Sequence, residues 1–176
     1  MKESIGGTWL FTIVIVFIVM FTTFVSVTTN YARCFKIKDA VVDKIEFHKG
    51  VNDETITDIK KMLTNLGYSS TGKCPDTGDN WFGFSVSDNN NAPTGYGGNV
   101  NFCIQKKQIV CPAKQINGRV EGSFDRFPSA YYTVVIFFKL DWPIIRQVFN
   151  IKISGETTII PYPRDIAQLK DVSGCD

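Results

Sequence analysis

The residues of this chain best suited to chemistry are five cysteines and a single histidine. No two cysteines form a Cys-x-x-Cys pair, so the spacing does not favour a zinc or thioredoxin-like site. His48 lies just before Gly50, with no catalytic Cys, Asp or Ser arranged around it, and we interpret it as a surface residue. In an exported domain, cysteines are typical of disulfides. The five are Cys34, Cys74, Cys103, Cys111 and Cys175.

One disulfide is predicted from where the cysteines fall. Cys74 opens a loop-rich segment and Cys103 lies in the first strong strand candidate, so a bridge between them would tie that segment to a sheet. The alternatives are a Cys103–Cys111 bridge across a hairpin that turns at residues 105–108, and five reduced cysteines in a cytoplasmic protein. An odd number leaves at least one thiol free, and Cys34 is our candidate for it.

Other chemical motifs are weak. The stretches DTGD and SDNNN offer oxygen ligands for calcium but lack the EF-hand spacing, so we interpret them as turns. Neither a nucleophile elbow nor a phosphate-binding glycine loop occurs in the sequence. Lys and Arg number 19 against 17 Asp and Glu, with no basic block. We therefore expect no enzyme activity, no cofactor, no metal and no nucleic-acid partner.

An N-terminal apolar run is the strongest signal of structure. No charged residue occurs between Ser4 and Ala32, and residues 9–27 have the length of about 20 residues that a helix needs to cross a bilayer. The run exceeds the apolar region of a signal peptide and lacks a small-x-small cleavage site. We predict that residues 1–33 contain a retained membrane helix, with membrane lipid as a partner and Trp9 and Tyr31 at the two interfaces.

The orientation of that helix has signals on both sides. Arg33, Lys36 and Lys38 follow the run and only Lys2 precedes it, which by the positive-inside rule points to a cytoplasmic domain. The short N-terminus, two nearby aspartates and the Cys, Asn and Gly content of the remainder point the other way. We expect a single-pass protein of the cell membrane with an extracellular C-terminal domain at residues 34–176.

Helical patterns continue beyond the membrane. With no Gly or Pro before Gly50, one helix is predicted from about residue 5 to 47, with residues 34–47 as an amphipathic stem. A second helix is predicted at 53–66, capped by Asn52 or Asp53 and ended by Gly67. Its apolar stripe is assigned to core packing. The stripe consists of Ile56, Ile59, Leu63 and Leu66.

The second half of the chain favours β-structure. Residues 68–98 are rich in Gly, Asn, Asp, Ser and Pro, which is typical of loops, with WFGFSV as one strand candidate. NVNFCIQKKQIVC, YYTVVIFFKL and FNIKISGETTII are rich in β-branched and aromatic residues. The predicted fold class is therefore α+β, with a long N-terminal helix, a short second helix and an antiparallel sheet within residues 81–160.

Two stretches resemble the TadE-like family of pilin-related proteins. The first is the short hydrophilic start with glycines that runs into the apolar helix, KESIGGTWLFTIVIVF. The second is YYTVVIFFKLDWPIIRQVFNIKISGETTII, similar to that family's strand, Pro-containing crossover and final strand, which ends here at Gly155 and Glu156. The resemblance implies a pilin-like fold and a minor subunit of Tad-type pili. The glutamate that pilins carry about five residues after the cleaved glycine is replaced here by Phe11 or Thr12.

The small residues at the helix start suggest helix packing. Gly6, Gly7 and Thr8 would let a neighbouring helix approach closely, and membrane helices gain specificity from such packing. The hydroxyls of Thr12, Thr22, Thr23 and Ser26 either bond across to that partner or bond to carbonyls of their own helix.

Together these features predict a structural or assembly subunit of a cell-surface pilus or related secretion system. Its partners would be other pilin-like subunits or pilus assembly proteins. The alternative is a membrane-anchored sensory or ligand-binding domain that uses the Asn- and Gly-rich loop segment as its binding surface.

Overall fold

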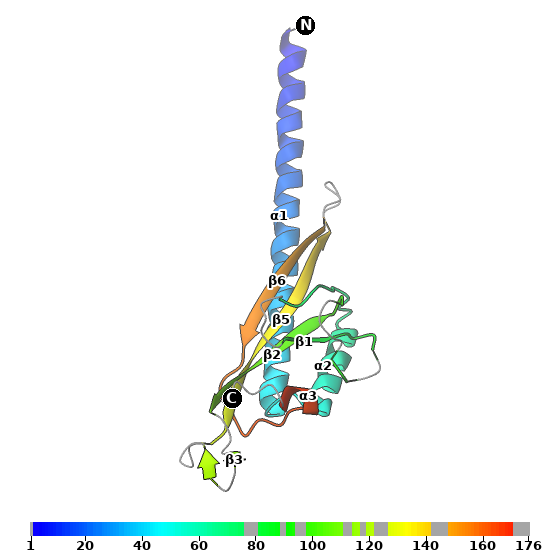
Figure 1. The fold of residues 1–176 in the computed structure, drawn as a ribbon. Coiled ribbons are helices and arrows are strands. Elements are labelled where there is room, and N and C mark those ends of the chain that lie inside the picture. Colours follow the sequence, from blue (N-terminus) through cyan, green and yellow to red (C-terminus); the bar gives the residue numbers. More distant parts are fainter. Residues whose placement is uncertain are drawn as a thin grey trace.

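One long helix runs through the whole molecule (Figure 1). The computed structural model describes residues 2–75, 81–88, 91–93, 98–110, 114–116, 119–121, 127–141 and 148–170. Helix α1 (Lys2–Phe47) has 46 residues, which corresponds to a length of about 70 Å. Its C-terminal part lies against the rest of the protein, whereas its N-terminal part projects away from it (Figure 1). The predicted long helix is confirmed.

Helix α2 (Asp53–Asn65) follows after a short turn. The side chain of Asn52 caps its N-terminus by accepting a hydrogen bond of 2.8 Å from the backbone N–H of Thr55. Just after its C-terminus, Gly67 adopts the left-handed conformation, with a φ of +64°. Ile56, Ile59 and Leu63 are buried as predicted. The prediction was wrong for Leu66, which is 57% exposed because it is the C-cap residue and lies beyond the last helical turn.

An antiparallel sheet makes up most of the domain. It has the order β1 (Trp81–Phe84), β2 (Phe102–Val110), β5 (Ser129–Asp141) and β6 (Val148–Glu156), and β7 (Ile160–Pro161) also pairs with β5. Strands β3 (Lys114–Ile116) and β4 (Arg119–Glu121) form a separate pair, and α3 (Ala167–Lys170) is a single turn. The chain is therefore α+β with a pilin-like layout, as the sequence predicts.

Two predicted connections differ from the structure. The hairpin at residues 105–108 was wrong, because β2 continues through them, paired with β5 from Phe102↔Ile136 to Gln108↔Ala130. The proposed Cys103–Cys111 bridge depended on that turn; Cys111 and Cys175 lie outside the described residues. The crossover implied by the resemblance is also wrong, since β5 and β6 are direct antiparallel neighbours up to the pair Asp141↔Val148.

The core has a layer on each face of the sheet. Alternate residues of β5, Tyr132, Val134 and Ile136, belong to the main layer, which the sheet forms with α1, α2 and the C-terminal segment. Val135 and Phe137 point to the other face, where Gly72 lies so close to the Phe137 ring that a Cβ would be 2.3 Å from it. The second layer consists of Trp81, Val100, Cys103, Val135 and Phe137, with Cys74 packed against it.

Helix α1 enters the main layer only through its last part. Cys34, Val41 and Ile45 are buried, and they recur about every one or two turns on one side of the helix. Gly155 of β6 allows a close approach, because a Cβ there would lie 2.6 Å from Cδ of Lys38. Residues 34–47 therefore form part of the sheet domain; we call them the packed segment.

Candidate functional site

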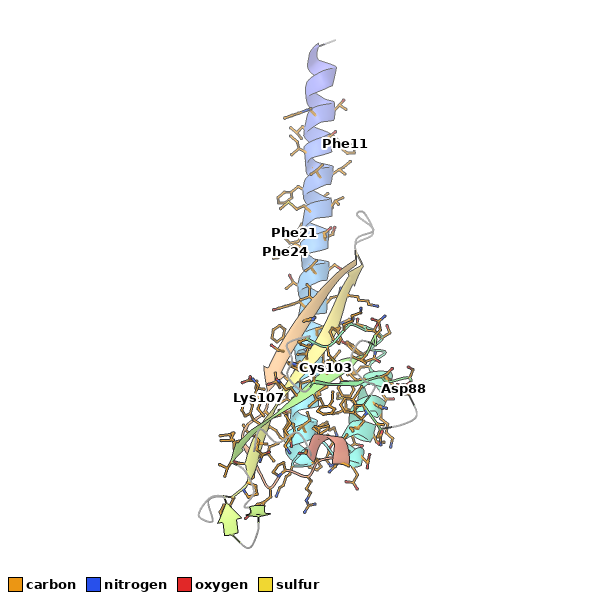
Figure 2. The ribbon with its side chains drawn as sticks, viewed as in Figure 1. Phe11, Phe21, Phe24, Asp88, Cys103 and Lys107 are labelled. Carbon is orange, nitrogen blue, oxygen red and sulfur yellow. A yellow bond between two sulfur atoms is a disulfide. The ribbon has the colours of Figure 1, made fainter. Side chains whose placement is uncertain are left out.

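A more N-terminal part of α1, residues 7–27, leaves nearly all of its apolar side chains uncovered; we call it the exposed segment. Apart from Val27, which is half-buried, its large apolar residues are 41% to 73% exposed, on every side of the helix (Figure 2). Among the described residues, α1 is the one helix that is both long enough and apolar enough to cross a membrane. No residue in its most apolar stretch is buried. The exposed residues are Trp9, Leu10, Phe11, Ile13, Val14, Ile15, Val16, Phe17, Ile18, Val19, Met20, Phe21, Phe24 and Val25.

The two predicted interface residues flank this surface, with Trp9 near its start and Tyr31 one turn beyond its end. Trp9 is 73% exposed and Tyr31 is 44% exposed. They are 22 positions apart in one helix, which is about 33 Å along the axis, close to the hydrocarbon thickness of about 30 Å. Tyr31 packs edge-on against Phe35, with 4.7 Å between the ring centroids, and the buried part of α1 begins at Cys34. The spacing therefore fits one bilayer between the two aromatic residues.

The residues predicted to pack helices are placed as follows. A Cβ on Gly7 would meet nothing within 4 Å, while Gly6 belongs to α1 but its surroundings lie outside the described residues. The Thr12 hydroxyl donates to the Thr8 carbonyl at 2.9 Å, and Thr22 and Thr23 likewise donate to carbonyls one turn earlier, at 3.0 and 2.7 Å. Within one chain these three hydroxyls therefore bond to carbonyls of their own helix, which is the second of the two alternatives.

The structure joins Cys74 and Cys103 in a disulfide with an S–S distance of 2.06 Å. Cys103 is on β2, on the sheet face opposite α1 (Figure 2), and the bridge ties the irregular segment after α2 to the sheet. Gly83 on β1 makes room for it, since a Cβ there would lie 3.1 Å from Cys74 Sγ. Cys34 is a free, buried cysteine, and its burial raises the pKa of the thiol.

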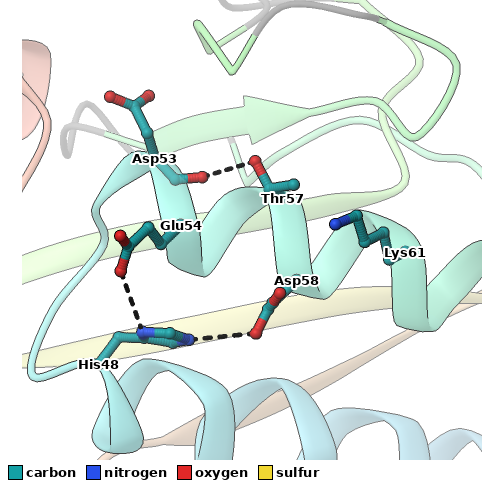
Figure 3. Close-up of a pocket in the computed structure, with 6 residues that line it drawn as sticks. All are labelled: His48, Asp53, Glu54, Thr57, Asp58 and Lys61. Carbon is teal, nitrogen blue, oxygen red and sulfur yellow. Dashed lines mark hydrogen bonds and ion pairs between the residues drawn. The ribbon is translucent and has the colours of Figure 1, made fainter.

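His48 is not the isolated surface residue that we predicted. It follows the end of α1, its side chain is only 15% exposed, and it lies between two carboxylates of α2 (Figure 3). Its Nε2 is 3.2 Å from Asp58 Oδ2, and its Nδ1 is 3.9 Å from Glu54 Oε2. Lys44 Nζ is 3.5 Å from the same Asp58 oxygen. The hydrogen bond from His48 and the positive charge of Lys44 hold the pKa of Asp58 below its usual value.

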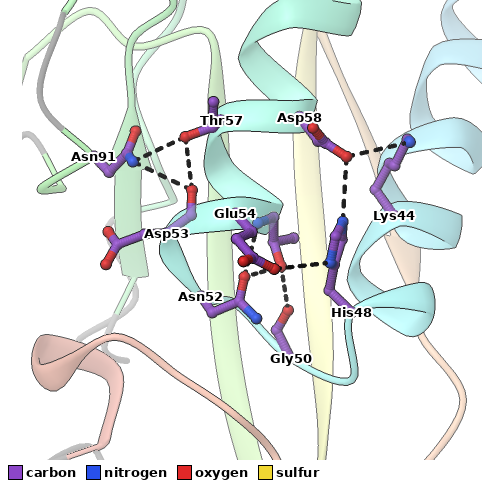
Figure 4. Close-up of polar contacts among 10 residues, drawn as sticks. Lys44, His48, Gly50, Asn52, Asp53, Glu54, Thr57, Asp58 and Asn91 are labelled. Atoms are coloured by element: carbon purple, nitrogen blue, oxygen red, sulfur yellow. Dashed lines mark hydrogen bonds and ion pairs between the residues drawn. The ribbon is translucent and has the colours of Figure 1, made fainter.

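An open hollow lies beside this cluster, lined by His48, Asp53, Glu54, Thr57, Asp58 and Lys61 (Figure 3). Part of its lining is engaged in contacts within the chain (Figure 4). Thr57 donates to the Asp53 carbonyl at 2.7 Å, and the Asn91 amide donates to the Thr57 hydroxyl at 3.0 Å. Among the described residues, no three His, Cys, Asp or Glu side chains lie together as metal ligands would. We interpret the cluster as the polar joint between α1 and α2.

A buried charged cluster anchors the C-terminal segment, and the sequence analysis missed it. Asp165 Oδ1 accepts hydrogen bonds from the Tyr132 hydroxyl at 2.5 Å and from the Val51 N–H at 3.0 Å. Its Oδ2 is 2.8 Å from Nζ of Lys106, with no hydrogen bond of good geometry. Burial and the Asp165 charge raise the pKa of the Tyr132 hydroxyl, so it stays a donor. No local pattern marks this cluster, because its members come from distant segments.

Among these features, only the exposed segment leaves a large apolar surface uncovered when a single chain folds. The polar joint, the disulfide and the Asp165 cluster all connect elements within the domain. The chain matches no protein-family model, no curated protein and no solved structure. The candidate functional site is therefore the exposed segment of α1.

Proposed function

We propose that this protein is a membrane-anchored, pilin-like subunit that serves as a structural or assembly component of a cell-surface pilus or related secretion system. The observation that carries the proposal is the division of α1. One continuous helix supplies both a surface of exposed apolar side chains and part of the core of a sheet domain. The anchor and the domain are therefore joined without a flexible linker, as a subunit of an ordered assembly requires.

The exposed segment needs an apolar environment. Transfer of apolar surface out of water is favourable by about 25 cal/mol per Å², so fourteen large exposed side chains would aggregate the protein in water. A bilayer satisfies them with one pass, and the helices of neighbouring subunits would satisfy them in a filament. The same surface thus serves both a membrane-inserted precursor and an assembled subunit.

Lateral packing would give this helix its specificity. Lipid is as apolar as Val or Phe, so association between membrane helices depends on close packing and polar contacts. Gly7 presents an open surface near the start of the helix. The domain would contact other subunits or the cell exterior from the outer side of the membrane.

The ligand-binding alternative has less support. In the described parts of residues 68–93, two polar side chains bond to the rest of the domain: Asn91 contacts α2, and the Tyr68 hydroxyl bonds the backbone of Phe137. Because no observation in these parts favours a ligand, we keep the assembly role as the proposal.

A helix exchange tests this proposal. Residues 9–27 are replaced by an unrelated single-pass anchor of equal length, and the native and exchanged proteins are compared by fractionation, mass spectrometry and co-purification with the pilus machinery. A packing element predicts that surface display persists while association with the machinery is lost. Co-purification of the exchanged protein at the native level would contradict the assembly role.

A further inference from the structure

The membrane-proximal end of the sheet lies beside the apolar helix. Strands β5 and β6 run along α1 toward its N-terminal part and end at the pair Asp141↔Val148 (Figure 1). In Figure 2 the ends of these strands reach the height of Phe24. Phe24 is 67% exposed and belongs to the exposed segment. A bilayer whose hydrocarbon covers residues 9–27 would therefore end close to the ends of these strands. Its headgroup layer, with Tyr31 in it, would lie over the part of the domain that follows.

Four cations lie on the domain side of the strand ends, where that headgroup layer would be. Arg33 and Lys36 follow the exposed segment on α1, Lys139 lies two residues before the end of β5, and Lys152 lies on β6, opposite Phe137. All four are exposed. We call Arg33, Lys36, Lys139 and Lys152 the basic collar.

The collar is not neutralised within the described part of the chain. No carboxylate there forms an ion pair with any of the four, and Lys139 Nζ contacts only the Thr71 hydroxyl, at 3.2 Å. The carboxylates of the same region are Asp39, which is paired with Lys38 at 2.7 Å, Asp43 one turn further along α1, and Asp141 at the strand end. Lys38 is excluded from the collar because it is engaged with Asp39 and the Phe35 ring.

We propose that the basic collar docks the domain onto anionic phospholipid headgroups. Two of its cations come from α1 and two from strands more than 100 positions later, so the folded domain, and not only the helix end, presents charge to the membrane. Each Lys or Arg near an anionic surface changes the docking equilibrium by about fivefold. The helix keeps the collar at the surface, so a weak interaction suffices. The inference rests on the membrane anchoring in the proposed function and not on the pilus role.

Lysine acylation footprinting of the full chain in lipid nanodiscs tests this. One set of discs contains phosphatidylglycerol and the other only phosphatidylcholine, and modification rates are read by mass spectrometry. Lys36, Lys139 and Lys152 should react about fivefold more slowly in the anionic discs. Lys49, Lys61 and Lys107, which lie on the remainder of the domain, are the internal control and should not change. Salt of about 1 M, where the Debye length is about 3 Å, should restore the collar rates.

A pair of matched variants adds a second readout. Hydrogen exchange at the ends of β5 and β6 should be slower in anionic discs for the native chain and for K49Q/K61Q/K107Q, but not for K36Q/K139Q/K152Q. Equal collar reactivity in the two disc types, or equal slowing at the three control lysines, would overturn the proposal. A chain that fails to enter discs at all would instead contradict the anchoring, and failure of the pilus role would appear only in the helix exchange.

Discussion

The exposed and packed segments of α1 differ mainly in what surrounds them. In the exposed segment Ile15 is 45% exposed, while in the packed segment Ile45 is fully buried. The packed segment alternates apolar residues with Lys, Asp and Glu, so one side is suited to a core and the other to water. The exposed segment is apolar on all sides, which no single sheet face can cover.

This contrast shows that one helix carries two kinds of surface. Burial of one stripe against the sheet fixes residues 34–47, whereas the surface of residues 7–27 stays uncovered in the folded chain. Mutations in the two segments should therefore have separable effects, on the stability of the domain for one and on membrane or subunit contacts for the other.

The largest loss of unfolding free energy is expected at the buried pair of Asp165 and Lys106, which anchors the C-terminal segment. Asp165→Asn leaves Lys106 buried without its ionic partner, and breaking a buried pair costs about 3–5 kcal/mol of unfolding free energy. Chemical denaturation of the full chain in detergent measures it. The double variant Lys106→Met/Asp165→Asn should lose less, because it leaves no unpaired buried charge and still offers an acceptor oxygen to Tyr132 and Val51. An equal loss in both variants would show that the charge pair is not the cause.

A second large loss of unfolding free energy is expected when the Cys74–Cys103 disulfide, on the sheet face opposite α1, is removed. The disulfide closes a loop of 29 residues, which the chain-entropy account converts to about 3–4 kcal/mol. Cys74→Ala should lower the unfolding free energy by about that amount and leave membrane association unchanged. The native protein under reducing conditions should match the variant. Peptide mapping without reductant that finds both thiols free in the native protein would contradict the assignment.

The same substitution at two positions of α1 tests the contrast itself. Ile45→Ala removes a fully buried side chain and should lower the unfolding free energy of the domain by about 2–5 kcal/mol. Ile15→Ala, in the exposed segment, should change it by less than about 0.5 kcal/mol. Denaturation followed by the domain's tryptophan fluorescence compares them. Similar losses in the two variants would mean that the exposed segment belongs to the domain's core.

The smallest effect is expected at the polar joint between α1 and α2. The pKa of Asp58 is lowered in the folded state, so its contribution is present above the unfolded value of about 3.9 and is lost as pH falls through the folded value. Asp58→Asn should therefore lower the melting temperature slightly at neutral pH, and the difference should vanish in strong acid. Lys61→Gln, a neighbour of the hollow, is the control. A difference that persists at low pH would contradict this account.

Local patterns predicted most of the fold. The exposed segment, the Asn52 cap and the strand runs depend on neighbouring residues, which a sequence displays directly. The strand β2 was misjudged because Gln105 and Lys106 look like turn residues, yet both are buried. Lys106 is tolerated in the core only because Asp165, which is distant in sequence, is its partner.

The candidate site was predicted unevenly for the same reason. Trp9 and Tyr31 follow from the apolar run, whereas the contacts of His48 with α2 depend on how two helices meet. The basic collar also requires the fold, since Lys139 and Lys152 come near the helix only through the sheet. Local residue patterns did not predict these contacts, because each one joins segments that are distant in the sequence.

Protease protection in intact, wall-stripped cells tests the central claim most directly, because it reports the membrane span and the position of the domain together. The account predicts that protease digests the domain that begins at Cys34 and leaves a short membrane-protected fragment that contains residues 9–27. Mass spectrometry of the fragment locates its end. Complete protection of the chain in cells that become sensitive only after lysis would contradict the outward domain, and release of the intact chain from washed membranes would contradict the span.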